Sequence, residues 1–110
     1  MAPFPELFRT LPEADVPIPG VAVRLLRGPT ASAIFWEATQ DTTVPEHRHG
    51  GQWGVVLEGE LRLTIGSEAR TCRRGDEYYI PAGTTHSAVL KAGARVIDFF
   101  DDPDRYRARA

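Results

Sequence analysis

The feature that most restricts the fold of this sequence is a succession of short apolar runs separated by glycine or proline. These runs are rich in β-branched and aromatic residues, and they follow one another from Val21 to Phe100. Apolar residues at helical spacing are confined to the short segment 6–11. Strands that recur roughly every 8–12 residues predict an all-β fold, either a sandwich or a closed barrel. Closure is favoured because it leaves few exposed sheet edges.

The strands can be assigned individually from the alternation of apolar and polar side chains. The segment 60–65 alternates most cleanly, with aliphatic residues on one face and polar residues on the other. The Gly66-Ser67 pair that follows it predicts a hairpin turn. The predicted strands are 21–26, 31–39, 42–44, 52–57, 60–65, 69–74, 77–80, 85–90 and 95–100.

The length of 110 residues is that of one domain. Residues 1–20 are rich in proline and predict an extended N-terminal arm laid over the fold; Phe4 and Phe8 favour this arm over a disordered tail. Residues 21–102 are expected to form the barrel, and residues 103–110 a short C-terminal tail.

The composition argues against several classes of function. The net charge is −2, so no basic surface favours nucleic acid or an anionic membrane. No apolar run reaches the roughly 20 residues that span a bilayer, and residues 1–20 lack the pattern of a secretory signal. A single cysteine, Cys72, cannot form a disulfide within the chain and is expected to be a buried thiol. We therefore expect a cytoplasmic protein without nucleic-acid or membrane partners.

Two of the three histidines, His47 and His49, are separated by one residue. On a strand, such residues point to the same face, where two imidazoles can form half of a transition-metal site. The pair alone leaves two interpretations open, because surface strands also contain it by chance. The third histidine, His86, follows a glycine- and proline-containing turn, where an incidental position in a hairpin is the alternative.

The surroundings of these histidines resemble the two motifs of the cupin superfamily. The second motif reads Gly-x5-Pro-x-Gly-x2-His, and the matching residues are Gly75, Pro81, Gly83 and His86. The first motif is matched at His47, His49 and Gly59, within the run Val56-Leu57-Glu58-Gly59-Glu60. The resemblance covers about residues 21–101 and implies a small single-domain cupin β-barrel, also described as a jelly roll.

The resemblance further implies one divalent metal ion bound by His47, His49 and His86. Where the first motif has glutamate, separated from Gly59 by six residues, this chain has Gln52. Polyketide-cyclase-like and uronate-linearising cupins use glutamine as a ligand, so Gln52 is expected to be the fourth; a site of three histidines is the alternative. This neutral set leaves the ion its full charge, which favours Lewis-acid chemistry and anionic ligands. The ligand types suit Zn, Mn, Fe or Ni.

The segment 98–106 resembles the end of the uronate-linearising cupins, where an aspartate, a phenylalanine and an arginine serve substrate binding and proton transfer. The matching residues are Asp98, Phe100 and Arg105, so Asp98 and Arg105 are candidate catalytic residues. Tyr79 is a further candidate for moving a proton. The alternative is structural, with Asp98 held by hydrogen bonds at the barrel end and Arg105 in a surface ion pair.

The leading expectation for function is a metal-dependent enzyme that acts on a small, oxygen-rich, anionic substrate by isomerase, lyase or cyclase chemistry. A non-catalytic cupin that binds a small ligand or a sugar acid is one alternative, and an iron-dependent dioxygenase is the other, because the fold alone does not determine function. Apolar residues on both faces of 52–57 also predict a homodimer that buries sheet surface.

Overall fold

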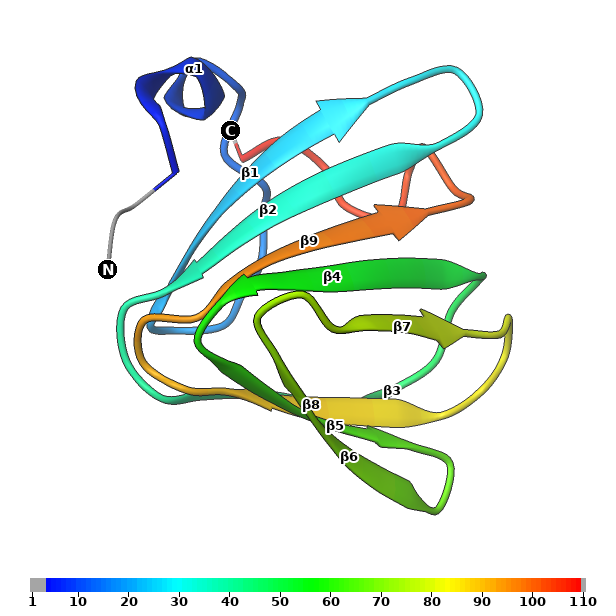
Figure 1. Ribbon diagram of the computed structural model, residues 1–110. Helices are drawn as coiled ribbons and strands as arrows, with labels where there is room; N and C mark the ends of the chain where they lie inside the picture. Colours follow the sequence, from blue (N-terminus) through cyan, green and yellow to red (C-terminus); the bar gives the residue numbers. More distant parts are fainter. Residues whose placement is uncertain (1–3, 110) are drawn as a thin grey trace.

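The computed structural model describes residues 4–109, which form two antiparallel sheets and one short helix (Figure 1). The all-β prediction is confirmed, and the observed strands follow the predicted ones closely. No helix in these residues is long and apolar enough to cross a membrane. The elements are α1 Glu6–Arg9, β1 Val21–Arg27, β2 Ser32–Ala38, β3 Thr42–His47, β4 Gln52–Glu58, β5 Glu60–Ile65, β6 Glu68–Arg73, β7 Glu77–Ile80, β8 His86–Leu90 and β9 Arg95–Phe100.

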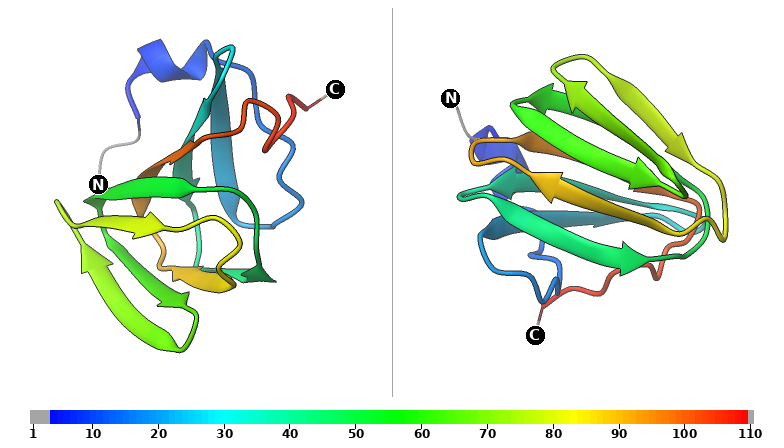
Figure 2. Two further views of the ribbon diagram at one scale, coloured as in Figure 1. Left: turned by 90° about the vertical axis from the view of Figure 1, so that its right-hand side faces the viewer. Right: turned by 90° about the horizontal axis from the view of Figure 1, so that it is seen from below.

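The two sheets lie face to face as layers of one small barrel (Figure 2). One sheet has the strand order β1-β2-β9-β4-β7 and the other has the order β3-β8-β5-β6. The chain therefore passes repeatedly from one sheet to the other, which is the connectivity of a jelly roll. The end of β3 pairs with the start of β8, and His47, His86 and Gln52 at these strand ends line one cavity.

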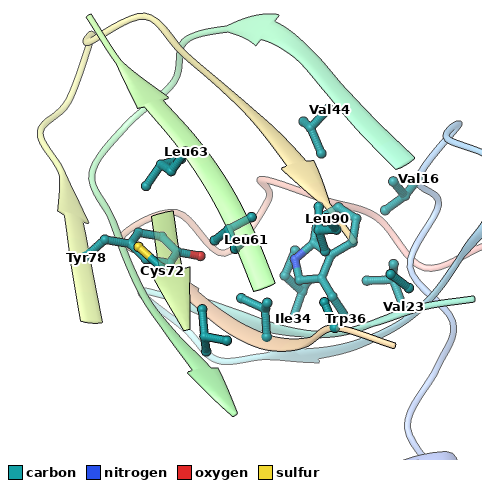
Figure 3. Packing of buried hydrophobic residues seen from close by; sticks show 14 of the residues in the cluster. Val16, Val23, Ile34, Trp36, Val44, Leu61, Leu63, Cys72, Tyr78 and Leu90 are labelled. Carbon is teal, nitrogen blue, oxygen red and sulfur yellow. The ribbon is translucent and has the colours of Figure 1, made fainter. Parts of the chain in front are cut away.

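Side chains that point between the sheets form the hydrophobic core (Figure 3). Ile34 on β2 and Val56 on β4 are completely buried, and Leu61 on β5 belongs to the same cluster from the other sheet. Burial of one such aliphatic side chain stabilises a fold by roughly 1.5–3 kcal/mol. Cys72 also lies in this core without exposed surface, so the prediction of a buried thiol is confirmed.

The segment before β1 packs along the barrel and pairs with the end of the chain. The Ala14 N–H donates to the Val23 carbonyl at 2.9 Å, and the Asp15 N–H donates to the Arg107 carbonyl at 2.7 Å. Val16 is only 3% exposed. The proline-rich segment is therefore a fixed part of the fold over residues 4–20, and it forms one wall beside the barrel.

The outer face of the five-stranded sheet carries a line of exposed apolar side chains. The strand register aligns Leu26, Ala33, Phe99, Trp53 and Tyr79 across β1, β2, β9, β4 and β7 in that order. The large members expose 52% of Leu26, 47% of Phe99, 37% of Trp53 and 63% of Tyr79. We call these five residues the outer apolar row.

Candidate metal centre

Three histidines from two strands and one loop meet inside the barrel. His47 ends β3 and His86 begins β8, and the two are direct partners in the antiparallel register. His49 lies in the loop after β3, yet its ring centroid is 5.1 Å from that of His47 and 4.7 Å from that of His86. One ligand atom from each ring lies within 4.8 Å of the others. This spacing is suited to a single metal ion.

Backbone carbonyls fix the orientation of all three rings. Each Nδ1 lies at hydrogen-bond distance from a carbonyl oxygen that can only accept, so Nδ1 carries the proton and Nε2 keeps its lone pair. The same arrangement orients metal-bound histidines in known metal sites. The pairs are His47 with Pro45 at 2.7 Å, His49 with Gly50 at 2.8 Å and His86 with Thr84 at 2.8 Å.

Buried polar atoms at the centre of the site have no hydrogen-bond partner within the described part of the chain. They are Nε2 of His49, Nε2 of His86 and Oε1 of Gln52. All three residues line one cavity of about 40 Å³ together with His47, which is enough for an ion and a water-sized ligand. More than about 90% of buried polar groups are satisfied in proteins, so these exceptions need a missing partner. Imidazole nitrogens with an amide oxygen are a donor set that fits a divalent first-row metal.

Two of the histidines, His47 and His49, are held in the neutral form that binds metals. Burial lowers the pKa of His47, and it lowers the pKa of His49 to about 4. The hydrogen bonds to backbone carbonyls act in the opposite direction, and the nearby positive charge of Arg105 adds to the lowering. At neutral pH both rings therefore offer a free Nε2 lone pair without first losing a proton.

The position of His49 differs from the expectation in one respect. Of the pair His47 and His49, only His47 belongs to a strand. The alternation of side chains along a strand therefore does not explain why these two rings converge. The His49 loop is instead fixed from both sides: the Gly83 N–H donates to the His49 carbonyl at 2.8 Å, and the Asp101 N–H donates to the Gly51 carbonyl at 3.3 Å. A Cβ at Gly50 would lie 2.7 Å from Oδ1 of the exposed Asp101 side chain, so a larger residue here would displace that carboxylate.

Asp98 lies beside Gln52 and lines the same cavity. It is 5% exposed, and its Oδ1 accepts a short hydrogen bond from the Tyr78 hydroxyl. Burial raises the pKa of Asp98, while hydrogen bonding from Tyr78 and the Gln52 side chain counteracts the rise. Because an ionised carboxylate only accepts hydrogen bonds, the Gln52 amide nitrogen faces Asp98 and Oε1 remains for a metal.

Gly54 makes room for this buried pair. The register places Gly54 directly opposite both Tyr78 and Asp98, on the strands to either side of β4. A Cβ at this position would overlap both the Tyr78 hydroxyl and the Asp98 carboxylate. Because Gly54 has no side chain, the two groups can meet across the strand that carries Gln52.

The structure separates the remaining predicted catalytic residues. Tyr79 belongs to the outer apolar row and does not line the cavity, because strand alternation turns Tyr78 inward instead. Arg105 lies at the mouth of the site, with its guanidinium 4.2 Å from the Tyr106 ring centroid. Its Nε is buried without a partner, and it forms no ion pair with any residue in 4–109. The expectation of a surface ion pair for Arg105 is therefore not met.

Three aromatic residues that line the cavity, Trp36, Tyr78 and Tyr106, are not among those predicted from the sequence. The sequence-based expectation names Tyr79 rather than Tyr78, although Ile80, which lies on the same strand face as Tyr78, indicates the inward face. Tyr106 lines the cavity from the C-terminal tail and packs edge-on against Trp36 at 6.3 Å. No local pattern in the sequence marks a tail residue of this kind.

Comparisons with known proteins agree with this geometry. The family model described as Cupin domain matches residues 35–100. No curated protein matches the sequence. The solved structure of KdgF from Halomonas sp. is 27% identical with a TM-score of 0.74, and the match covers 84% of this chain and 87% of that one.

Two further solved structures share the fold. An RmlC-like cupin from Shewanella frigidimarina is 24% identical with a TM-score of 0.77, and the match covers 89% of each chain. Oxalate decarboxylase from Bacillus subtilis, a protein with Mn(II) centres, is 21% identical with a TM-score of 0.69. That match covers 81% of this chain but only 28% of the decarboxylase. The family match spans more than half of the chain. The histidines of the chain meet in one cavity, and its strands form a jelly roll. The protein therefore belongs to the cupin family.

Proposed function

We propose that this cupin is a metal-dependent enzyme that acts on a small anionic substrate by isomerase, lyase or cyclase chemistry. The observation that carries the proposal is the set of buried, partnerless ligand atoms of His49, Gln52 and His86 in one cavity. Leaving such atoms unpaired costs about 1–3 kcal/mol each. A divalent ion, bound with His47 as well, provides the partner that all of them lack.

The charge of the ligand set supports Lewis-acid chemistry. Three neutral imidazoles and one carboxamide leave a divalent ion with its full positive charge. When bound, such an ion polarises a carbonyl or carboxylate oxygen and stabilises the negative charge that develops beside it. Arg105 places a further positive charge at the mouth of the site, which favours a substrate that carries a carboxylate.

Asp98 is the group placed to transfer a proton. It lies beside Gln52 and lines the cavity that holds the ligand atoms. Burial raises the pKa of Asp98, which makes its carboxylate a stronger base than an exposed one. The Tyr78 hydroxyl donates to Oδ1 and holds the carboxylate in one orientation. We assign proton transfer to Asp98 and the positioning of Asp98 to Tyr78.

The proposal is tested by turnover of the metal-loaded protein. Protein loaded with Zn(II) or Mn(II) is incubated with a panel of sugar acids and 2-oxo acids, and products are analysed directly. An unsaturated uronate that is linearised loses its ultraviolet absorbance. Loss of a general base lowers kcat by roughly 100-fold or more, so Asp98→Asn should do so while ligand affinity stays nearly constant. Glu68→Gln, which changes an exposed carboxylate, is the matched control.

The outcomes separate the alternatives. Ligand binding without turnover across the panel would contradict the enzyme proposal and favour a cupin that only binds a small ligand. Oxygen consumption with Fe(II) that is absent with Zn(II) would instead indicate a dioxygenase. Turnover with Zn(II), which has no redox chemistry, excludes an oxygen-dependent step and supports the proposed mechanism.

A further inference from the structure

A second cavity adjoins the metal centre. It measures about 310 Å³, and it shares His47 and Tyr106 with the smaller metal-centre cavity. The metal-centre cavity of about 40 Å³ has room for an ion and a few water-sized groups beside it. The larger second cavity, which we call the arm groove, is therefore the space next to His47 that can receive a bulkier part of a substrate.

Six of the nine residues that line the arm groove are apolar or aromatic. Three of these six come from the N-terminal arm, two from β3 and one from the C-terminal tail. They are Val16, Pro17, Ile18, Val44, Pro45 and Tyr106.

The arm wall is fixed in position by bonds to the rest of the chain. The Thr42 hydroxyl donates to the Pro19 carbonyl at 2.7 Å, and the Arg109 guanidinium donates to the Val16 carbonyl at 3.3 Å. The Ile18 N–H also bonds to the Val16 carbonyl at 2.8 Å, which holds the two side chains of the wall in a compact turn. The groove is therefore formed before any ligand enters, and a ligand does not have to order it.

Few polar side chains face the groove within the described residues. Arg105 supplies positive charge, His47 is committed to the metal centre, and Glu46 is exposed at the rim. The Tyr106 hydroxyl already accepts a hydrogen bond from Arg105 at 3.1 Å. A ligand rich in hydroxyl groups would exchange water for apolar walls here and leave several hydroxyls without partners. An alkyl or aryl group would lose no hydrogen bonds in the same place.

We propose that the arm groove receives an alkyl or aryl substituent of the substrate. The substrate class is then a 2-oxo acid or its enol that carries a branched aliphatic or aromatic side chain. Its two adjacent oxygens reach the metal centre, its carboxylate lies near Arg105, and its side chain packs against Ile18. This assignment rests on the proposed metal centre, and it gives the N-terminal arm a role in substrate selection.

The assignment is tested with acids that share one coordinating head and differ in the rest. Zn(II)-loaded protein is titrated by calorimetry with pyruvate, 4-methyl-2-oxopentanoate, phenylpyruvate and the polyhydroxylated 2-oxogluconate. Burial of the branched or aromatic group predicts binding about 10- to 50-fold tighter than that of pyruvate. We expect 2-oxogluconate to bind no more tightly than pyruvate.

Variants of Ile18 separate the groove from the metal centre. Ile18→Asn should remove the preference for the apolar acids while pyruvate binds as before and the zinc content stays unchanged. Ile18→Trp should fill the groove and weaken phenylpyruvate selectively. Leu26→Asn makes a similar change on the outer apolar row. It should leave the affinities for pyruvate and for the apolar acids unchanged.

Three results would overturn the assignment: equal affinity for all four acids, tightest binding of 2-oxogluconate, or no binding of any acid to zinc-loaded protein. Each of these leaves the bound zinc in place and so differs from failure of the metal centre, which would appear as absence of zinc from the wild-type protein. Selective binding without turnover would contradict the enzyme proposal alone.

Discussion

Replacing Tyr78 with phenylalanine should destabilise the protein strongly, although only one oxygen atom is removed. The hydroxyl is buried and donates to Asp98, which is itself buried. A hydrogen bond to a charged buried group contributes about 1.5–3 kcal/mol, and its removal also leaves the carboxylate short of a donor. We therefore expect Tyr78→Phe to lower the free energy of unfolding by about 2–3 kcal/mol. The adjacent Tyr79→Phe is the control, because its side chain is 63% exposed.

The assay is urea unfolding of the metal-free protein, followed by circular dichroism. For a slope of about 1–3 kcal/mol per molar urea, the midpoint of Tyr78→Phe should fall by roughly 0.7–3 M, and that of Tyr79→Phe should shift far less.

The same variant makes a prediction about pH. Burial raises the pKa of Asp98 above its unfolded value, so ionisation of Asp98 costs stability as the pH rises through that range. The hydrogen bond from the Tyr78 hydroxyl lowers the pKa of Asp98. Removal of this hydroxyl should therefore reduce the free energy of unfolding more at pH 7 than at pH 5. Equal urea midpoints for Tyr78→Phe and Tyr79→Phe would refute the assigned hydrogen bond between Tyr78 and Asp98. A stability loss in Tyr78→Phe that becomes smaller as the pH rises would also refute it.

Three other properties follow from the structure. His49 has a pKa of about 4 in the folded protein and 6.5 as a free side chain. The free energy of unfolding of the metal-free protein should therefore fall by about 1–2 kcal/mol as the pH falls through that interval. Thermal melts that show no such loss in the wild type, or an equal loss in His49→Gln, would contradict this. Burial raises the pKa of Cys72, so the thiol of the folded protein should not react with a disulfide reagent until the protein unfolds. Rapid labelling of the folded protein would contradict the burial of this thiol in the core. We propose that two copies pair through the outer apolar row, whose large side chains expose roughly 400 Å², about half of what one partner buries in a standard interface. Sedimentation should then give a dimer at micromolar concentration and a monomer for Phe99→Lys, whereas a monomeric wild type would exclude the pairing.

Local patterns in the sequence were sufficient for most of the fold. The alternation in 60–65 is a property of six consecutive residues, and the structure finds β5 within the same bounds. The fixed spacing from Gly75 to His86 likewise encodes one strand, one turn and the start of the next. Such signals need no knowledge of distant parts of the chain, because the period of a strand is set by the backbone.

The remaining features depend on contacts between distant segments. Alternation with Ile80 indicates that Tyr78 faces inward, but its contact with Asp98 depends on the pairing of β7 and β9 with β4 on either side of Gly54, which no single strand specifies. The arm groove exists because the arm and the tail are bonded, as in the bridge between Ala14 and Ala108. His49 reaches the metal centre through a loop held by Gly83, so a rule for strands could not place it.

The central claim is that three imidazoles and one carboxamide bind a single divalent ion. It is tested most directly by metal content, measured by elemental analysis after Mn(II) loading and exhaustive dialysis. We predict one ion per chain in the wild type and in the exposed control Glu46→Ala. His86→Ala should retain almost none, and Gln52→Leu should retain less than one ion per chain. One ion per chain in His47→Ala and His86→Ala alike would contradict the account.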